Sequence, residues 1–156
     1  MNAVFNKLNY KDQASIYVLN APASFHGAMD EMQQVASVHD TLARAKDVSF
    51  AMAFATKQTE VDAFADKIAK VTVGDAVVWV AYPKGSSKNY ICEFNRDTGW
   101  AKLGEHSFEP VRQVAIDEDW SALRFRQVEH IKTMTRSFAM TKTGQNKVQE
   151  SKKRSK

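Results

Sequence analysis

The longest apolar run in this chain reads Ala76-Val77-Val78-Trp79-Val80-Ala81-Tyr82. It has no polar residue at alternate positions, so both of its faces are apolar. This pattern is typical of a central parallel strand that helices cover on both sides. The run is too short for a membrane span, which needs about 20 residues. The sequence therefore predicts a buried strand in the middle of an α/β sheet, between a turn at Gly74-Asp75 and a loop that begins at Pro83.

Further strands are predicted upstream of this run. Ser15–Asn20 and Val48–Ala55 are rich in β-branched and aromatic residues, which favours strands. Val38–Leu42 is predicted as a shorter strand between them. Each of these segments is followed by residues with a helical apolar spacing or with turn-forming character, so the sequence predicts that strands and helices alternate.

Two helices are predicted between these strands. Phe25, Met29 and Met32 recur at helical spacing, and Ser24 is placed to cap that helix. Thr59-Glu60-Val61-Asp62 resembles a capping signature at the start of a second helix. A shorter helix is expected near Trp100. The apolar stripe of the second helix comprises Val61, Phe64, Ala65 and Ile68.

The last two strands are predicted to form a hairpin. Val111–Ile116 and Ser121–Arg126 are separated only by residues 117–120, and a parallel crossover needs a dozen residues or more. The two strands must therefore pair antiparallel. The predicted faces place Val114 with Ile116, Leu123 with Phe125, and Arg124 with Arg126 on the side opposite Leu123 and Phe125.

This order of elements resembles the later half of a Rossmann-like methyltransferase sheet, which closes with such a hairpin. The stretch from Asp75 to Val128, with its segments Val77–Lys88, Arg96–Trp100 and Phe108–Arg126, is similar to a small bacterial family of unknown function. The resemblance implies a Rossmann-like three-layer sandwich, mostly parallel and ending in an antiparallel β-hairpin, and a bacterial source. It implies no particular activity.

Length and composition indicate how the chain is organised. With 156 residues, 44% hydrophobic and 26% charged, it has an ordinary globular composition. We expect one α/β domain over residues 1–130 and a basic tail over residues 131–156. The only cysteine, Cys92, excludes a disulfide scaffold. A free thiol without a secretory signal predicts a cytoplasmic protein.

The positive charge of the chain is concentrated in its last thirty residues. From Gln127 to Lys156 there are eight basic and two acidic residues, a net charge of +6, whereas the preceding residues carry −2. A segment with few large apolar residues cannot repay its ordering entropy by burial, so we expect a mobile tail. Such cations could bind polyanions without reading sequence. The candidate nucleic-acid contacts are Lys142, Lys147, Lys152, Lys153, Arg154 and Lys156.

The usual cofactor motifs are missing from the sequence. In a parallel sheet, ligands bind beyond the carboxyl ends of the strands, which here are Asn20–Ser24, Thr56–Thr59 and Pro83–Lys88. A dinucleotide or adenosyl-methionine site usually has a glycine-rich turn after the first strand, but Asn20–Ser24 contains Pro22 and no glycine. The four histidines are scattered, and Cys92 lies among apolar residues that favour a buried, inert thiol. The sequence predicts no catalytic residue, cofactor or metal site.

Two weak candidate ligand sites remain, and each also has a purely structural interpretation. The loop after the central strand supplies Lys84, Ser86, Ser87 and Lys88, which could hold a phosphate or carboxylate or simply form a solvated turn. Arg96 and Asp97 could flank a ligand at the same edge, or form an ion pair and a helix cap.

A third candidate is acidic. Residues 117–120 carry three adjacent carboxylates that could bind Mg²⁺ or Ca²⁺, although a charged hairpin turn with Trp120 packed on the sheet explains them better.

These observations favour a non-catalytic Rossmann-like module that binds a small anionic ligand or a protein partner in a bacterial cytoplasm, with no membrane association. One alternative is a divergent enzyme, methyltransferase-like or dependent on a phosphate ligand, that uses the Lys84–Lys88 loop with Arg96 and Asp97. The other is weak nucleic-acid binding through the basic tail.

Overall fold

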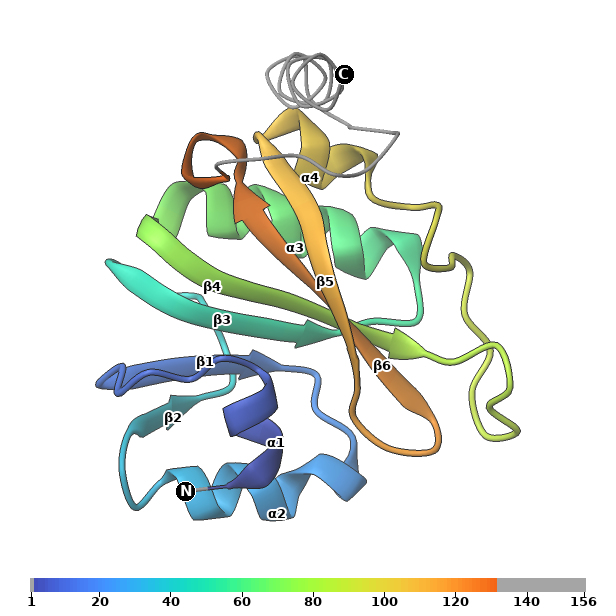
Figure 1. The fold of residues 1–156 in the computed structure, drawn as a ribbon, viewed down its shortest axis with the longest axis horizontal. Coiled ribbons are helices and arrows are strands. Elements are labelled where there is room, and N and C mark those ends of the chain that lie inside the picture. Colours follow the sequence, from blue (N-terminus) through green and yellow to red (C-terminus); the bar gives the residue numbers. More distant parts are fainter. Residues whose placement is uncertain (1, 132–156) are drawn as a thin grey trace, which may run out of the picture.

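The computed structural model describes residues 2–131, which form a six-stranded sheet with helices on both faces (Figure 1). The spatial order of the strands is β2-β1-β3-β4-β6-β5. The strands are β1 (Ser15–Leu19), β2 (Ser37–His39), β3 (Val48–Phe54), β4 (Thr72–Pro83), β5 (Phe108–Ala115) and β6 (Trp120–Gln127). The helices are α1 (Ala3–Lys7), α2 (Ala23–Met32), α3 (Gln58–Val71) and α4 (Ala101–Glu105), and a 3₁₀ turn, η1 (Val128–His130), follows β6.

The sheet is mostly parallel and ends in an antiparallel hairpin, as the sequence predicted. Strands β2, β1, β3 and β4 pair parallel to one another, and β6 pairs antiparallel to both β4 and β5. The predicted pairing of Val111–Ile116 with Ser121–Arg126 is therefore confirmed. Because β6 lies between β4 and β5, β4 has a strand on each side and occupies the interior of the sheet.

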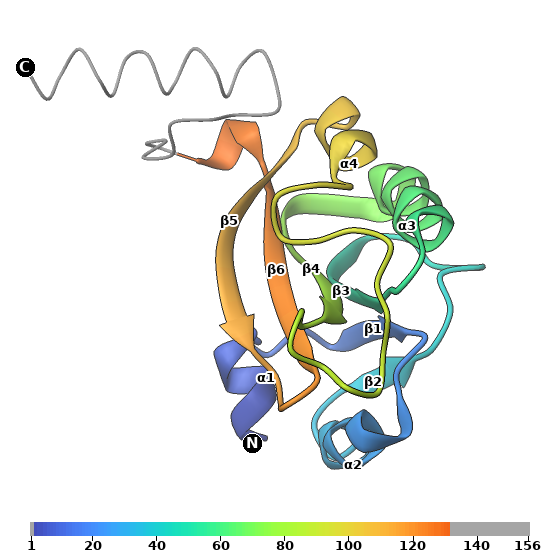
Figure 2. The same cartoon turned by 90° about the vertical axis from the view of Figure 1, so that its right-hand side faces the viewer.

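Two apolar layers cover the two faces of β4, which makes the fold a three-layer sandwich. Helices α3 and α4 pack on the face that carries Val78 and Val80, and α1 and α2 pack on the face that carries Trp79 (Figure 2). All residues from Ala76 to Tyr82 are buried, and Trp79 has no exposed surface. This burial confirms the central strand predicted from the apolar run.

The N-terminal helix α1 was not predicted. Asn2 caps it, because its side-chain oxygen accepts hydrogen bonds from the backbone N–H groups of Val4 (2.9 Å) and Phe5 (3.3 Å). The Trp79 indole N–H donates to the carbonyl of Leu8 just beyond the helix, at 2.8 Å. This bond couples the N-terminal segment to the central strand, which lies far away in the sequence.

The structure corrects both predicted helix starts. Helix α2 begins at Ala23 with Pro22 at the N-cap, so Ser24 lies within the first turn and does not cap it. Helix α3 begins at Gln58, so Thr59 does not cap either. The Glu60 carboxylate instead reaches back one turn and accepts the backbone N–H of Lys57 at 3.1 Å, which is half of a capping box.

Several strand boundaries also differ from the prediction; β5, for example, begins at Phe108 and not at Val111. The Gly74-Asp75 turn was wrong, because β4 runs from Thr72 through Gly74, whose φ of 57° coincides with a shift of register against β3. Strand β2 is only Ser37–His39, whereas Val38–Leu42 was expected. Leu42 lies in the loop after β2, and its side chain is buried in the core.

Among residues 2–131, no helix combines the length and the apolar character that crossing a membrane requires.

Candidate functional site

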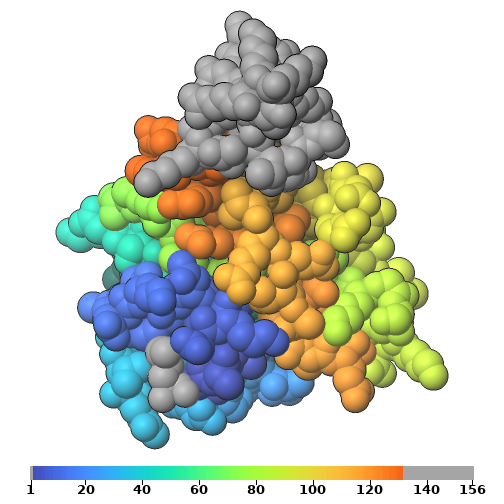
Figure 3. Space-filling view, in the orientation of Figure 1, coloured from blue at the N-terminus to red at the C-terminus, as the bar shows by residue number. Residues whose placement is uncertain are grey.

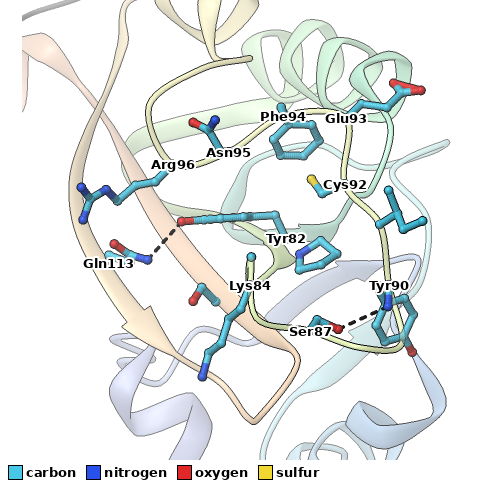
Figure 4. Close-up of a pocket in the computed structure, with 14 residues that line it drawn as sticks. Tyr82, Lys84, Ser87, Tyr90, Cys92, Glu93, Phe94, Asn95, Arg96 and Gln113 are labelled. Atoms are coloured by element: carbon cyan, nitrogen blue, oxygen red, sulfur yellow. Dashed lines mark hydrogen bonds between the residues drawn. The ribbon is translucent and has the colours of Figure 1, made fainter.

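A pocket of about 680 Å³ lies where β4 ends, between the loop of residues 84–100 and the β5–β6 hairpin (Figure 4). Its floor is formed by Tyr82 and Pro83 at the end of β4, with Gln113 of β5 and Ser121 of β6 beside them. This is the carboxyl end of a parallel strand, where α/β sheets commonly bind ligands. In the order β2-β1-β3-β4, the chain adds β2 on one side of β1 and β3 on the other, so the topological switch point lies between β1 and β3. The pocket lies at β4, on the hairpin side of this switch point.

An aromatic cluster forms the wall between the pocket and the core. The Tyr82, Phe94 and Trp100 rings lie 5.1–6.2 Å apart, centroid to centroid, in tilted and edge-on arrangements. Gly99 makes this packing possible, since its φ is 92° and a Cβ there would lie 2.6 Å from Cβ of Phe94. The wall is therefore fixed by close packing and by one glycine conformation.

Hydrogen bonds hold the first part of the loop in place. The Ser87 hydroxyl donates to the Asp119 carboxylate at 2.8 Å and accepts the backbone N–H groups of Asn89 and Tyr90, both at 3.2 Å. The backbone N–H of Lys84 donates to the carbonyl of Asp119 at 2.7 Å. Ser87 thus lines the pocket while its hydroxyl ties the loop to the hairpin turn.

The middle of the loop is tied to α3. The backbone N–H of Glu93 donates to the carbonyl of Thr56 at 3.0 Å, and the Glu93 carboxylate accepts the backbone N–H of Gln58 at 2.9 Å. Because this carboxylate is bound at the start of α3, it does not point into the pocket; Figure 4 shows it directed outward. The acidic residue in the lining therefore does not cancel the positive charge inside.

Hydrogen-bonding groups converge on the floor of the pocket. The Gln113 side-chain amide donates to the Tyr82 hydroxyl at 3.1 Å, which leaves the Tyr82 O–H proton able to donate to a ligand. Burial raises the pKa of Tyr82, so this phenol stays protonated. Burial also raises the pKa of the Cys92 thiol, which keeps the sulfur neutral. Ser121 adds a buried hydroxyl.

Two cations lie on the pocket lining. Arg96 extends beside Gln113 on one side of the Tyr82 ring (Figure 4). Lys84, the first residue after β4, extends on another side of the ring. Arg96 also lies 3.6 Å from a carboxylate oxygen of Asp97, but the two side chains are 64% and 79% exposed. A pair this exposed contributes little, so Arg96 remains available to an anion.

The structure separates the predicted site residues into three groups. Lys84, Ser87 and Arg96 line the pocket together, whereas Ser86 and Lys88 are exposed on the same loop and do not line it. Asp97 lines a smaller neighbouring pocket of about 300 Å³, which it shares with Arg96. The predicted tail contacts, Lys142, Lys147, Lys152, Lys153, Arg154 and Lys156, lie outside the described residues.

Some pocket residues were not predicted because they come from distant parts of the sequence. Tyr82 was assigned only to the core, and Gln113 and Ser121 only to strands; the hairpin register brings them together. Cys92 was expected to be a buried, inert thiol, but it is only partly buried and lines the pocket.

The acidic hairpin turn has a structural role. Asp117 accepts the backbone N–H groups of Asp119 (2.8 Å) and Trp120 (2.9 Å). The Asp119 carboxylate accepts the Ser87 hydroxyl and the Asn89 amide. Within residues 2–131, no group of three or more histidine, cysteine, aspartate or glutamate side chains is placed to hold a metal ion. Trp120 packs on the sheet against Phe54, as predicted.

Comparison with solved structures identifies the class of fold. A SAM-dependent methyltransferase from Aquifex aeolicus is similar with a TM-score of 0.56 and 10% sequence identity, over 80% of this chain and 87% of that protein. The N-methyltransferase NodS from Bradyrhizobium japonicum gives a TM-score of 0.43 and 15% identity, over 71% and 72% of the two chains. A protein of the NADB-Rossmann superfamily from Streptococcus agalactiae gives 0.45 and 11%, over 81% and 68%.

At these identities the likeness concerns the fold alone, and it rests on the Aquifex protein. The chain has a methyltransferase-like Rossmann α/β fold, as the order of its elements predicted. No protein-family model matches the sequence, and a comparison with curated protein sequences finds no match.

The turn after β1 does not fit the SAM on which the similar Aquifex methyltransferase depends. A glycine-rich turn would let the backbone approach such a cofactor closely. Here Asn20 takes the left-handed conformation (φ 58°), Ala21 follows, and Pro22, which has no N–H, forms the N-cap of α2. Each of these positions carries a Cβ, so the turn lacks the open backbone cradle of a cofactor site.

Proposed function

We propose that this chain binds a small anionic ligand in the pocket at the end of β4 and that it does so without catalysis. The observation that carries the proposal is that Lys84, Arg96 and Tyr82 line one cavity. The volume of about 680 Å³ lies within the range of small-molecule sites, about 300–1,000 Å³. The loop over the pocket is already anchored, so binding would require little ordering.

The lining indicates which ligand chemistry would fit. Phe94 and Pro83 offer apolar surface, while Lys84 and Arg96 supply positive charge at the rim. The Tyr82 hydroxyl offers a proton deeper in the cavity. A metabolite with a carboxylate or phosphate at one end and a flat or apolar body would use all three features.

The protonation states favour binding over catalysis. A general base or nucleophile works best with a pKa near the working pH, but burial moves the pKa values of Tyr82 and Cys92 upward, away from neutrality. Both side chains therefore stay protonated and act as neutral hydrogen-bonding or packing groups. This contrasts with the alternative of a divergent enzyme, which would need an activated group in the cavity.

A thermal-shift screen tests the proposal. The panel comprises nucleotides, phosphorylated metabolites, small carboxylates and adenosyl-methionine. A ligand at 100 times its Kd adds about 2.7 kcal/mol, which raises the Tm of a domain this size by several degrees. For any ligand that stabilises the protein, Lys84→Gln should lower the affinity about tenfold, since a charge-assisted contact is lost.

Lys88→Gln is the matched control, because Lys88 lies on the same loop and does not line the pocket. This variant should bind like the unmodified protein. No stabilisation across the panel would contradict the proposal and favour a protein partner. Turnover of a stabilising compound would contradict the non-catalytic part of the proposal.

A further inference from the structure

Two arginines lie directly opposite each other on the β5–β6 hairpin. The strand register pairs Arg112 of β5 with Arg124 of β6, and Arg124 pairs with Trp79 of β4 on its other side. Side chains at directly opposed positions lie about 5 Å apart at Cβ, and like charges there destabilise the sheet. This pair therefore lowers the stability of the fold, and a function in binding would explain its presence.

A β-bulge creates the arginine pair. From Phe108 to Pro110, each residue of β5 opposes one residue of β6, and the register then shifts between Pro110 and Arg112. Val111 is the extra residue: if the register did not shift, Val111 would oppose Arg124 in place of Arg112. Bulges often redirect side chains near functional sites, and this one replaces a neutral neighbour of Arg124 with a cation.

Neither guanidinium group forms an ion pair with a carboxylate within residues 2–131. The charge of Asp75 favours the Arg124 cation, but its carboxylate is hydrogen-bonded to Arg126, whose Nε donates to its two oxygens at 2.9 and 3.0 Å. Glu109, opposite Arg126 on the same face, is fully buried and has interaction partners of its own. No ion pair among the described residues joins Arg112 or Arg124 to an acid.

Arg124 also carries an unsatisfied donor. Its Nε is buried and has no hydrogen-bond partner, which costs free energy in the unliganded protein. Its pKa is lowered mainly by burial and also by the charges of Arg126 and Arg112, while the charge of Asp75 acts in the opposite direction. An oxyanion bound between the two guanidinium groups would relieve the repulsion between them.

We propose that Arg112 and Arg124 form a site for a phosphate group on the outer face of the hairpin. Guanidinium groups match phosphate oxygens with paired hydrogen bonds and keep their charge at all relevant pH values. The space-filling view shows hairpin surface open to solvent beside the N-terminal segment (Figure 3). There Lys7 extends the positive surface, with its ammonium group donating to the carbonyl of Ala115 at 2.8 Å.

This site is separate from the pocket at the end of β4. Gln113 and Leu123, which neighbour the two arginines in sequence, point to the opposite face of the sheet, toward the pocket and the α3 layer. Arg112 lies on the edge strand β5 and also borders the smaller pocket, together with Arg96, Asp97 and Gln113. The test therefore includes a control cation that lines neither pocket.

The experiment measures binding of tripolyphosphate and of a short DNA duplex to the full chain at fixed ionic strength. We expect Arg112→Gln and Arg124→Gln each to weaken tripolyphosphate binding about tenfold, while Arg44→Gln, which removes one exposed charge elsewhere, changes it less than twofold. Lys88→Gln, at a cation that lines neither pocket, should also leave it unchanged. If the duplex responds to the same two variants, the phosphate comes from a nucleic-acid backbone; if it does not, it is a free phosphate compound.

Stability provides an independent readout. Without ligand, Arg124→Gln should melt at the same temperature as the unmodified protein or higher, because the repulsion and the buried unpaired Nε are removed together. A lower Tm would overturn the inference by showing that Arg124 supports the fold. Equal losses in all four variants, no binding of tripolyphosphate, or tighter binding of poly-glutamate than of tripolyphosphate would overturn it as well. If Arg124→Gln fails to fold, Arg112→Gln, at an exposed position, decides the outcome: unchanged binding of tripolyphosphate by this variant would overturn the inference.

Discussion

Adding one methyl group at Gly99 should destabilise the protein strongly. The Cβ of an alanine would lie 2.6 Å from Cβ of Phe94 and 2.9 Å from the side-chain oxygen of Gln58. Gln58 uses this amide to bond the Gly99 carbonyl (2.8 Å) and Asp62 (2.9 Å), so it has little freedom to move away. The φ of 92° is also unfavourable for any residue with a Cβ.

Two costs therefore add in Gly99→Ala. Forcing alanine into a sparsely populated backbone region costs about 1–3 kcal/mol, and overpacking a tight contact costs about 1–3 kcal/mol more. The smaller entropy of the unfolded alanine chain offsets only about 0.4–1 kcal/mol. We expect the free energy of unfolding to fall by about 1–6 kcal/mol, with loss of the aromatic wall of the pocket.

Urea denaturation followed by tryptophan fluorescence measures this change. Two other glycines provide matched controls, since a Cβ at either Gly27 or Gly85 meets nothing within 4 Å. Gly27→Ala, inside α2, should stabilise the protein by about 0.5–1 kcal/mol. Gly85→Ala, on the same loop as Gly99, should change stability by less than about 0.5 kcal/mol. An unchanged midpoint for Gly99→Ala would refute the assignment of this contact.

Three further predictions concern single side chains. Trp79→Phe removes the donor to the Leu8 carbonyl and leaves that acceptor buried, so urea denaturation should show a loss of about 1–3 kcal/mol. The hydrogen bond from Arg126 lowers the pKa of Asp75 in the folded protein. The ion pair therefore stabilises the fold at pH values above the ordinary pKa of an aspartate, and this stabilisation is lost as the pH falls through the lowered pKa. The stability difference between the unmodified protein and Asp75→Asn should therefore disappear in strong acid, and a difference that persists there would contradict the pairing. Burial raises the pKa of Cys92, so its alkylation rate should rise with pH above the range of an ordinary thiol; a plateau near neutrality would contradict a protonated thiol.

The sequence predicted most of the sheet because local pattern and connection length settled it. The apolar run of β4 required cover on both faces, and the four residues between β5 and β6 left only antiparallel pairing. The start of α2 was misplaced because Pro22 occupies the cap position that Ser24 was expected to take. Helix α1 was missed because five residues give no periodic signal, and its place depends on the bond from Trp79 to Leu8.

The candidate site was only partly predictable. Lys84, Ser87 and Arg96 were found because they follow the central strand, where ligands bind in such sheets. Gln113 and Ser121 reach the pocket through the hairpin register, which no local pattern in the sequence encodes. The arginine pair likewise depends on a bulge whose position becomes visible only in the paired strands.

Protection of Cys92 from alkylation tests the central claim, ligand binding in the pocket at the end of β4, most directly. Cys92 is the only cysteine in the chain and lines this pocket, so one labelling rate reports on one place. For the compound of the thermal-shift panel that stabilises the protein most, the alkylation rate should fall with occupancy, at least tenfold at saturation. The concentration for half protection should match the Kd and should rise about tenfold in Lys84→Gln. A stabilising compound that leaves the rate unchanged at saturation would place its binding elsewhere and contradict the account.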